Sequence, residues 1–141
     1  MYKACIFDLD GTIADTVESI AYVGNRTLAH FHLPPIPVED YNFYAGNGAD
    51  ELVRRMLAAV PGGDKADYEQ VRRLYRKWFA EDPFYHVKPF EGIIEMLEEL
   101  KKEGMKIALY SDMIFKYASP NHTYLNPSGK LGQEVCSRIP D

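Results

Sequence analysis

Two aspartates, Asp8 and Asp10, stand two residues apart at the end of a short apolar run near the N-terminus of the 141-residue chain. Side chains at positions i and i+2 of a strand share one face, and ligands of open α/β sheets bind at the carboxyl ends of the strands. Gly11 and Thr12 follow directly, and a glycine there lets main-chain amides approach an anion closely. These four residues are candidates for acid–base, metal and anion chemistry. On composition alone, aspartates and a glycine that simply end a strand are an equally good interpretation.

The elements that position these residues follow from the spacing of apolar side chains. Residues 3–9 and 106–110 are short, mostly apolar runs, and each predicts a buried parallel strand. Apolar residues recur at three- and four-residue steps in four stretches between them, which predict helices at about residues 15–31, 52–60, 68–78 and 92–103. Strand, helices and strand in this order predict a parallel α/β sheet.

Local signals mark where these helices begin and end. Asp15-x-x-Glu18 resembles a capping box at the start of the first helix, and Gly104 stands where a left-handed C-terminal cap is expected. Prolines at 34, 35 and 37 prevent the first helix from continuing. The aromatic residues of 41–44, with Trp78, lack interleaved basic residues, so we expect them to pack in a helical core.

Composition and charge narrow the classes of partner. The formal net charge is -5, with no block of lysine or arginine, so nucleic acid is not an expected partner. No apolar run approaches the roughly 20 residues that a membrane helix needs, and the apolar stretch at the start is too short for a secretory signal. We therefore expect a cytoplasmic protein without a membrane segment. Cys5 and Cys136 lie near opposite ends and support neither a disulfide framework nor a zinc ribbon.

The ten residues 7–16, FDLDGTIADT, resemble the first signature of the haloacid dehalogenase-like hydrolase superfamily in its D-x-D-G-T phosphatase form. Residues 47–49 and 89–92, and the strand that ends at Ser111, are similar to segments of the phosphoglycolate phosphatase-like members. The resemblance covers about residues 1–112. It implies a Rossmann-like parallel sheet with an inserted helical cap.

The resemblance implies distinct roles for the two aspartates. Asp8 would be the nucleophile that forms an aspartyl-phosphate, and a Mg²⁺ ion held by its carboxylate would offset its repulsion from the phosphate. Asp10 would be the general acid and then the general base, and its main-chain carbonyl would also bind the metal. A halide leaves without being protonated, so the second carboxylate favours phosphoryl transfer over dehalogenation.

The resemblance also implies a set of phosphate contacts. Gly11 and Thr12 would supply amides that face the phosphate, and the Ser111 hydroxyl would hold the transferring phosphoryl group together with the amide of Asp112. Asp112 stands where many relatives have asparagine. A carboxylate that faces a phosphate is unfavourable unless it is turned away or paired.

The same comparison implies how the chain divides. Residues 1–15 and 87–112 would form a partial Rossmann-like core, residues 16–86 the helical cap, and residues 113–141, where no regular pattern persists, an irregular tail. Caps of this kind close over the site, exclude water and select the leaving group. Asn47 and Gly48 are candidates for a cap loop that reaches the substrate, and a plain interhelix turn is about as good an interpretation.

The function that these residues predict is a magnesium-dependent phosphatase acting on a small phosphorylated metabolite, of the phosphoglycolate kind. The superfamily also uses a lysine and a later acidic metal motif, and after Ser111 the sequence shows neither in a recognisable context. One alternative is therefore an incomplete, truncated relative that binds phosphate or metal weakly. Another is a β-phosphoglucomutase-like phosphomutase, which uses the same two aspartates. The substrate and the oligomeric state are open at this level.

Overall fold

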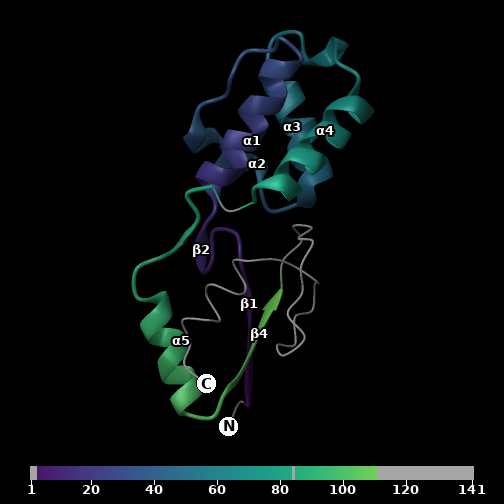
Figure 1. Cartoon of the computed structure of the whole chain (residues 1–141). Coiled ribbons are helices and arrows are strands. Elements are labelled where there is room, and N and C mark those ends of the chain that lie inside the picture. Colours follow the sequence, from purple (N-terminus) through teal and green to yellow (C-terminus); the bar gives the residue numbers. More distant parts are fainter. Residues whose placement is uncertain (1–2, 84, 111–141) are drawn as a thin grey trace. The chain divides into compact units, whose positions relative to one another are not determined.

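A computed structural model describes residues 3–83 and 85–110 of the chain (Figure 1). Main-chain contacts divide the chain into two units, Met1–Asp15 with Val87–Asp141, and Thr16–His86. The first unit contains the described strands and one helix, and the second contains the remaining helices. Each unit is described separately below. Ser111, Asp112 and the predicted tail at 113–141 lie outside the described residues.

The first unit contains the two predicted parallel strands. β1 (Ala4–Asp8) pairs with β4 (Lys106–Tyr110) in parallel register, from Ala4 opposite Lys106 to Asp8 opposite Tyr110. The α/β class and the parallel pairing are thus confirmed. The predicted burial is wrong for part of β1, because Ile6 is 63% exposed. Among the described residues β1 has β4 as its one sheet neighbour. At this exposure, no described element covers the Ile6 side chain.

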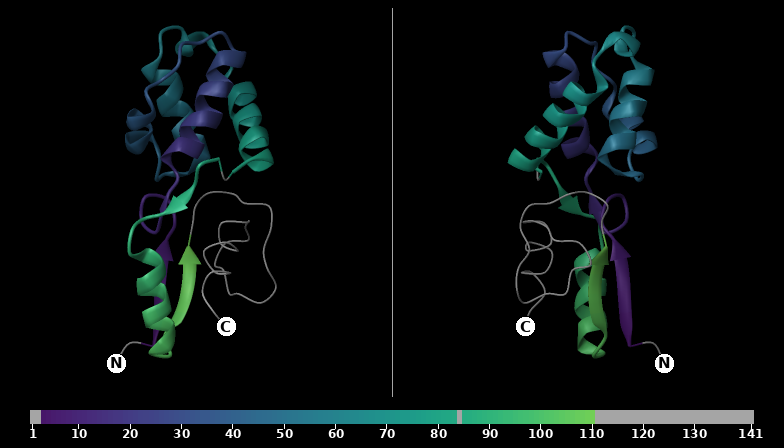
Figure 2. Two further views of the ribbon diagram at one scale, coloured as in Figure 1. Left: turned by 60° about the vertical axis from the view of Figure 1, so that its left-hand side comes forward. Right: turned by 90° about the vertical axis from the view of Figure 1, so that its right-hand side faces the viewer.

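The helix α5 (Ile93–Lys102) lies along the β1–β4 pair and buries Leu97 (Figure 2). Its end is the predicted glycine cap, since Gly104 has a φ of +74°. The Gly104 amide donates to the carbonyl of Lys101 at 2.9 Å, and the Met105 amide donates to that of Leu100 at 3.0 Å. These bonds satisfy carbonyls of the last helical turn, which the helix itself leaves unpaired. The chain then turns directly into β4.

The first unit also contains a two-stranded antiparallel ribbon. It lies where the chain leaves this unit and where it returns to it. β2 (Ala14–Asp15) pairs with β3 (Lys88–Pro89). The Phe90 amide extends the ribbon by donating to the carbonyl of Ile13 at 3.3 Å. The two chain segments that lead to the helical unit are therefore hydrogen-bonded to each other beside the turn that follows β1.

The second unit is helical, and its elements follow in order along the chain: α1 (Val17–His30), η1 (Val38–Asp40), α2 (Tyr41–Tyr44), α3 (Gly48–Ala59), η2 (Gly63–Lys65) and α4 (Tyr68–Glu81). Helices α1 and α3 both pack against α4 (Figure 1). The core between them is apolar and fully buried, with Leu28, Val53 and Tyr75 among its members. No helix in the described ranges is long and apolar enough to cross a membrane.

The predicted capping box at the start of α1 is wrong. Thr16 occupies the N-cap position, with φ of -112° and ψ of 0°, and no side chain caps the first turn. Glu18 instead pairs with His86, with 2.7 Å between Oε2 and Nδ1. This hydrogen bond links the first turn of α1 to the last residue of the helical unit, so the glutamate bonds across the unit instead of back to the main chain.

The aromatic residues of 41–44 are split between core and surface. Tyr41 is fully buried, as predicted, whereas Phe43 is 77% exposed, so the prediction that the whole group packs inside is wrong. The reason is the short helix α2, because residues two apart on a helix face different sides. One face of this single turn meets α1, and Phe43 points away from it.

Tyr41 packs directly over a glycine of α1. A Cβ atom placed on Gly24 would lie 2.5 Å from Oη and 2.6 Å from Cε1 of Tyr41. The Tyr41 hydroxyl donates to Asn25 Oδ1 at 3.0 Å, and burial raises the pKa of Tyr41 far above its usual value. The Asn25 amide also bonds both the amide and the carbonyl of Ile36, each at 2.8 Å. The tyrosine ring is therefore fixed and cannot move aside.

Gly24→Ala should destabilise the chain by about 1 to 2 kcal/mol. Alanine favours a helix by about 1 kcal/mol over glycine, but overpacking a rigid core costs roughly 1 to 3 kcal/mol and should outweigh it. Urea unfolding followed by circular dichroism measures the difference. Ala29→Ser, at an exposed position of the same helix, is the control and should change stability by less than about 0.5 kcal/mol. A Gly24→Ala variant as stable as the parent would contradict the close contact.

Candidate active site

The candidate site begins at the carboxyl end of β1. Asp8 is the last residue of the strand and is exposed, Leu9 is 1% exposed, and Asp10 is half-buried. The Leu9 side chain is therefore part of the core, and both aspartates are more exposed than it is. Asp8 and Asp10 thus flank a buried residue at the strand end, and a shared side for their carboxylates stays a prediction.

The turn after β1 is built around the carbonyl oxygen of Leu9. It accepts hydrogen bonds from the amides of Thr12, Ile13 and Ala14 at 3.3, 3.2 and 3.0 Å. The Gly11 amide donates to the carbonyl of Ala14 at 2.9 Å, and Gly11 has a φ of +74°, which favours glycine. The sequence Asp-Gly-Thr forms a tight turn because only a residue without Cβ enters this conformation at no cost.

The Thr12 side chain bonds to the first aspartate. Its hydroxyl donates to Asp8 Oδ2 at 3.3 Å. The bond holds one carboxylate oxygen in place and leaves the second oxygen for other partners. The amides of Gly11 and Thr12 are used inside the turn here, so their predicted contact with phosphate stays a prediction. Ser111 and Asp112 lie outside the described residues, and their predicted contacts stay predictions too.

The donor set at the strand end fits a hard divalent cation. Mg²⁺ prefers oxygen ligands and is commonly held by one or two carboxylates, with waters and substrate phosphates completing its coordination. Asp8 offers an exposed carboxylate, and Asp10 a second one two residues on. Residues 3–83 and 85–110 contain no group of three or more His, Cys, Asp or Glu placed to hold a metal. Asp8 and Asp10 are therefore the described residues that could hold such an ion.

In the helical unit, Asn47 directly precedes α3, and Gly48 is the first residue of that helix. Asn47 is the N-cap residue of α3, and its side chain makes no capping bond. Its Oδ1 accepts a hydrogen bond from the Arg55 guanidinium at 2.8 Å instead. Gly48 has a φ of +79°. The helix therefore begins four residues before the apolar stripe that predicts it.

A single arginine organises this loop. The Arg55 guanidinium donates to the carbonyls of Phe43 and Tyr44, each at 3.2 Å, and to Asn47 Oδ1. Its Nε pairs with Glu51 at 3.2 Å. Arg55 is thus a structural residue that fixes the end of α2 and the start of α3. Helical spacing can indicate the pair with Glu51, but not the contacts of Arg55 with the preceding loop.

A second set of ion pairs joins α3 to α4. Asp50 Oδ2 lies 3.3 Å from the Arg72 guanidinium, and Asp50 Oδ1 lies 2.7 Å from that of Arg76. Glu69 also pairs with Arg72, at 2.8 Å, and raises its pKa. Asp50 is 22 and 26 residues from Arg72 and Arg76 in sequence, so no local pattern indicates these two pairings. Two of the arginines of α4 are thereby neutralised by carboxylates of the same unit.

Arg55→Ala should cost about 1 to 2 kcal/mol of stability and loosen the loop at 43–47, because several carbonyl and carboxylate acceptors lose a charged donor. Arg54→Ala is the matched control. The Arg54 side chain is 59% exposed against 32% for Arg55, and its contact with Glu51 is 3.8 Å long. We expect it to change stability by less than about 0.5 kcal/mol. Chemical denaturation and amide hydrogen exchange of the loop measure both effects, and equal effects of the two substitutions would contradict the assigned role.

Curated relatives share the sequence over most of this chain. The phosphoglycolate phosphatase of Thiobacillus denitrificans is 30% identical over 120 residues, which are 84% of this chain and 53% of that protein. The enzyme of the same name from Aquifex aeolicus is 32% identical over 127 residues, 90% of this chain and 57% of that protein. The chain thus spans about half the length of the curated relatives it matches.

Solved structures share the fold. A predicted phosphoglycolate phosphatase from Haemophilus somnus superimposes with a TM-score of 0.72 at 24% identity, over 79% of this chain and 52% of that one. CbbY from Rhodobacter sphaeroides, solved in complex with phosphate, gives a TM-score of 0.60 at 22% identity, over 80% and 52%. The family model described as haloacid dehalogenase-like hydrolase matches residues 5–125. The Asp8–Thr12 turn lies within that match, and the chain belongs to the haloacid dehalogenase-like hydrolase family.

Proposed function

We propose that this chain is a magnesium-dependent phosphatase that hydrolyses a small phosphomonoester of the phosphoglycolate kind through an aspartyl-phosphate. The observation that carries the proposal is the tight turn at the end of β1, which carries Asp8 and Asp10 and places the Thr12 hydroxyl on Asp8. The relatives named phosphoglycolate phosphatase support the substrate class. CbbY solved with phosphate supports a phosphate ligand for this fold.

In the first step, the free carboxylate oxygen of Asp8 attacks the phosphorus of the ester. A bond forms between that oxygen and phosphorus, and the bond from phosphorus to the ester oxygen breaks. Asp10, protonated, gives its proton to the leaving alkoxide. The Thr12 hydroxyl holds the other oxygen of Asp8 and so orients the attacking one.

In the second step, the Asp10 carboxylate takes a proton from a water molecule, and the oxygen of that water attacks the phosphorus. The bond between phosphorus and Asp8 breaks, which releases inorganic phosphate and restores both carboxyl groups. One residue serves as acid and then as base because it is left deprotonated by the first step.

Asp8 and the main-chain carbonyl of Asp10 would hold the Mg²⁺ ion. When bound, it offsets the repulsion between the nucleophile and the phosphate oxygens and favours the attack. Gly11, Thr12, Ser111 and Asp112 are the proposed phosphate contacts. For Gly11 and Thr12 this requires the amides to share or exchange their present acceptors in the turn.

Residues 16–86 are the proposed cap, which matches the helical unit Thr16–His86 in extent. Asn47 and Gly48 are the proposed substrate contacts of this cap. Arg55 would act there as a positioning residue, since its guanidinium fixes Asn47 Oδ1. The Asn47 Nδ2 group would then be the part of the side chain that is left for a substrate carboxylate or phosphate.

Purified chain with Mg²⁺ should release inorganic phosphate from phosphoglycolate, and Asp8→Asn should reduce turnover by at least 10³-fold, because the amide is a poor nucleophile. Asp15→Asn, at a half-buried aspartate of the neighbouring ribbon, is the control and should retain most activity. Absence of turnover in a folded preparation would contradict the proposal and favour a chain that only binds phosphate or metal.

Asp10→Asn separates the two steps. 4-Nitrophenolate leaves without needing a proton, so this variant should release about one equivalent of nitrophenol from 4-nitrophenyl phosphate and then stop, because no base activates the water. Rapid-mixing absorbance measures the burst, and intact-protein mass spectrometry detects the phosphorylated chain. Steady turnover without a burst would show that Asp10 does not serve as the base.

A further inference from the structure

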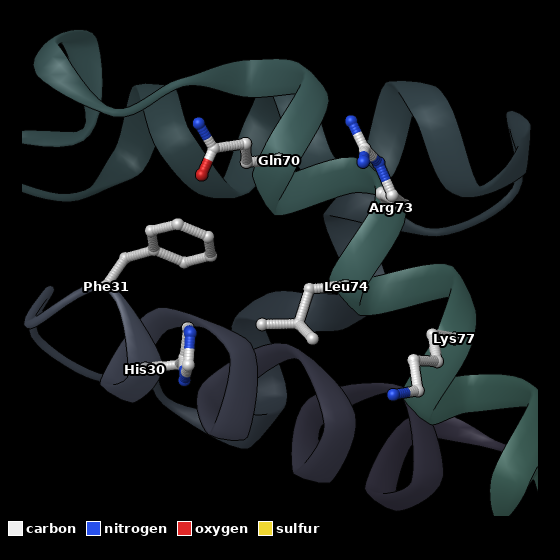
Figure 3. A pocket seen from close by; sticks show the side chains of 6 residues that line it. All are labelled: His30, Phe31, Gln70, Arg73, Leu74 and Lys77. Carbon is white, nitrogen blue, oxygen red and sulfur yellow. The ribbon is translucent and has the colours of Figure 1, made fainter.

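A groove in the helical unit lies between the end of α1 and α4 (Figure 3). Its volume is about 240 Å³, and its lining comprises His30, Phe31, Gln70, Arg73, Leu74 and Lys77. None of these residues belongs to the candidate active site. The groove is therefore a separate feature, and its chemistry can be argued from its own lining.

Two basic side chains, Arg73 and Lys77, belong to the lining of the groove. Arg73 and Lys77 are four residues apart on α4, so their side chains share one face of the helix, and both are exposed. Neither makes a hydrogen bond or an ion pair within residues 3–83 and 85–110. The pair is a concentration of positive charge on a chain with a net charge of -5.

Arg73 is the arginine of the described ranges for which no ion pair and no stacking contact is found. Each of those contacts a carboxylate or lies over an aromatic ring: Arg26, Arg54, Arg55, Arg72 and Arg76. Five guanidinium groups of the described ranges are thus paired or stacked. The sixth, that of Arg73, lines the groove and can reach a ligand there.

The acidic side chains near this end of α4 are already bonded. Asp67 accepts the main-chain amides of Glu69 and Gln70 and the Gln70 side-chain amide, at 3.0, 3.2 and 2.9 Å. The Gln70 bonds lower the pKa of Asp67 most, and the charge of Arg73 contributes. Glu69 is paired with Arg72. Neither carboxylate forms an ion pair with Arg73.

The lining also contains aromatic and apolar side chains. Phe31 and Leu74 are half-buried, and Figure 3 shows them facing the same space from the end of α1 and from α4. The His30 ring meets Phe31 edge-on, with 5.2 Å between centroids, and also meets Trp78, at 5.6 Å. These contacts fix the His30 ring beside the groove.

We propose that this groove binds a small organic anion. Its carboxylate or phosphate would pair with Arg73 or Lys77, and an aromatic or apolar portion would lie against Phe31 and Leu74. The groove is smaller than the roughly 300 to 1,000 Å³ of pockets for drug-sized ligands, which limits the occupant to a small molecule. The proposal does not depend on the proposed phosphatase activity.

Phenyl phosphate, titrated without Mg²⁺ and followed by calorimetry and by NMR shifts of groove residues, tests the site. Binding should be saturable, weaken with salt, and be at least tenfold tighter than that of inorganic phosphate, which lacks the ring. The same titration with benzoate shows whether a carboxylate serves in place of the phosphate.

The double variant Arg73→Gln/Lys77→Gln should weaken binding at least tenfold, and Arg73→Lys should retain most of it. Lys65→Gln, which removes an exposed charge that does not line the groove, is the matched control. Asp8→Asn should leave this binding unchanged. Binding that survives the double variant, binding lost in Asp8→Asn, or no binding of either phenyl phosphate or benzoate would overturn the proposal.

Discussion

Three main-chain amides converge on the carbonyl oxygen of Leu9, and the candidate site depends on this convergence. The buried Leu9 side chain fixes the main chain from one side, and the three hydrogen bonds fix it from the other. Asp8 and Asp10 flank this point, so the turn fixes the main chain on which both aspartates stand. The same turn delivers the chain to β2, whose pairing with β3 joins the segments that lead into and out of the helical unit.

The parts of the fold that depend on local periodicity were predictable from the sequence. β4 has the bounds that its apolar run predicts, β1 is shorter by one residue at each end, and Gly104 caps α5 as expected. What was not predictable depends on contacts between distant residues. Glu18 has the spacing of a capping box, yet it bonds a histidine 68 residues away. Phe43 belongs to an aromatic group whose one helical turn directs its members to different sides.

The candidate site shows the same division. The positions of Asp8, Asp10, Gly11 and Thr12 follow from one strand and one turn, so ten adjacent residues predict them. Arg55 could not be assigned from the sequence, since arginines on a helix of mixed polarity are usually solvated. Its role is visible only once α2 and α3 are placed, because three of its acceptors lie 8 to 12 residues earlier in the chain.

The strand-end turn carries the acidic side chains of Asp8 and Asp10, whereas the groove carries the basic side chains of Arg73 and Lys77. A phosphate dianion about 4 Å from the Asp8 carboxylate would be repelled by roughly 8 kcal/mol at an effective dielectric constant of 20, about the whole binding energy of a micromolar ligand. Attack by Asp8 thus requires a cation at the turn, and this requirement links the proposed nucleophile to magnesium. The groove of Arg73 and Lys77 already carries its cations. Without magnesium, an organic phosphate should therefore favour the groove, and magnesium should make the turn competitive for the same phosphate.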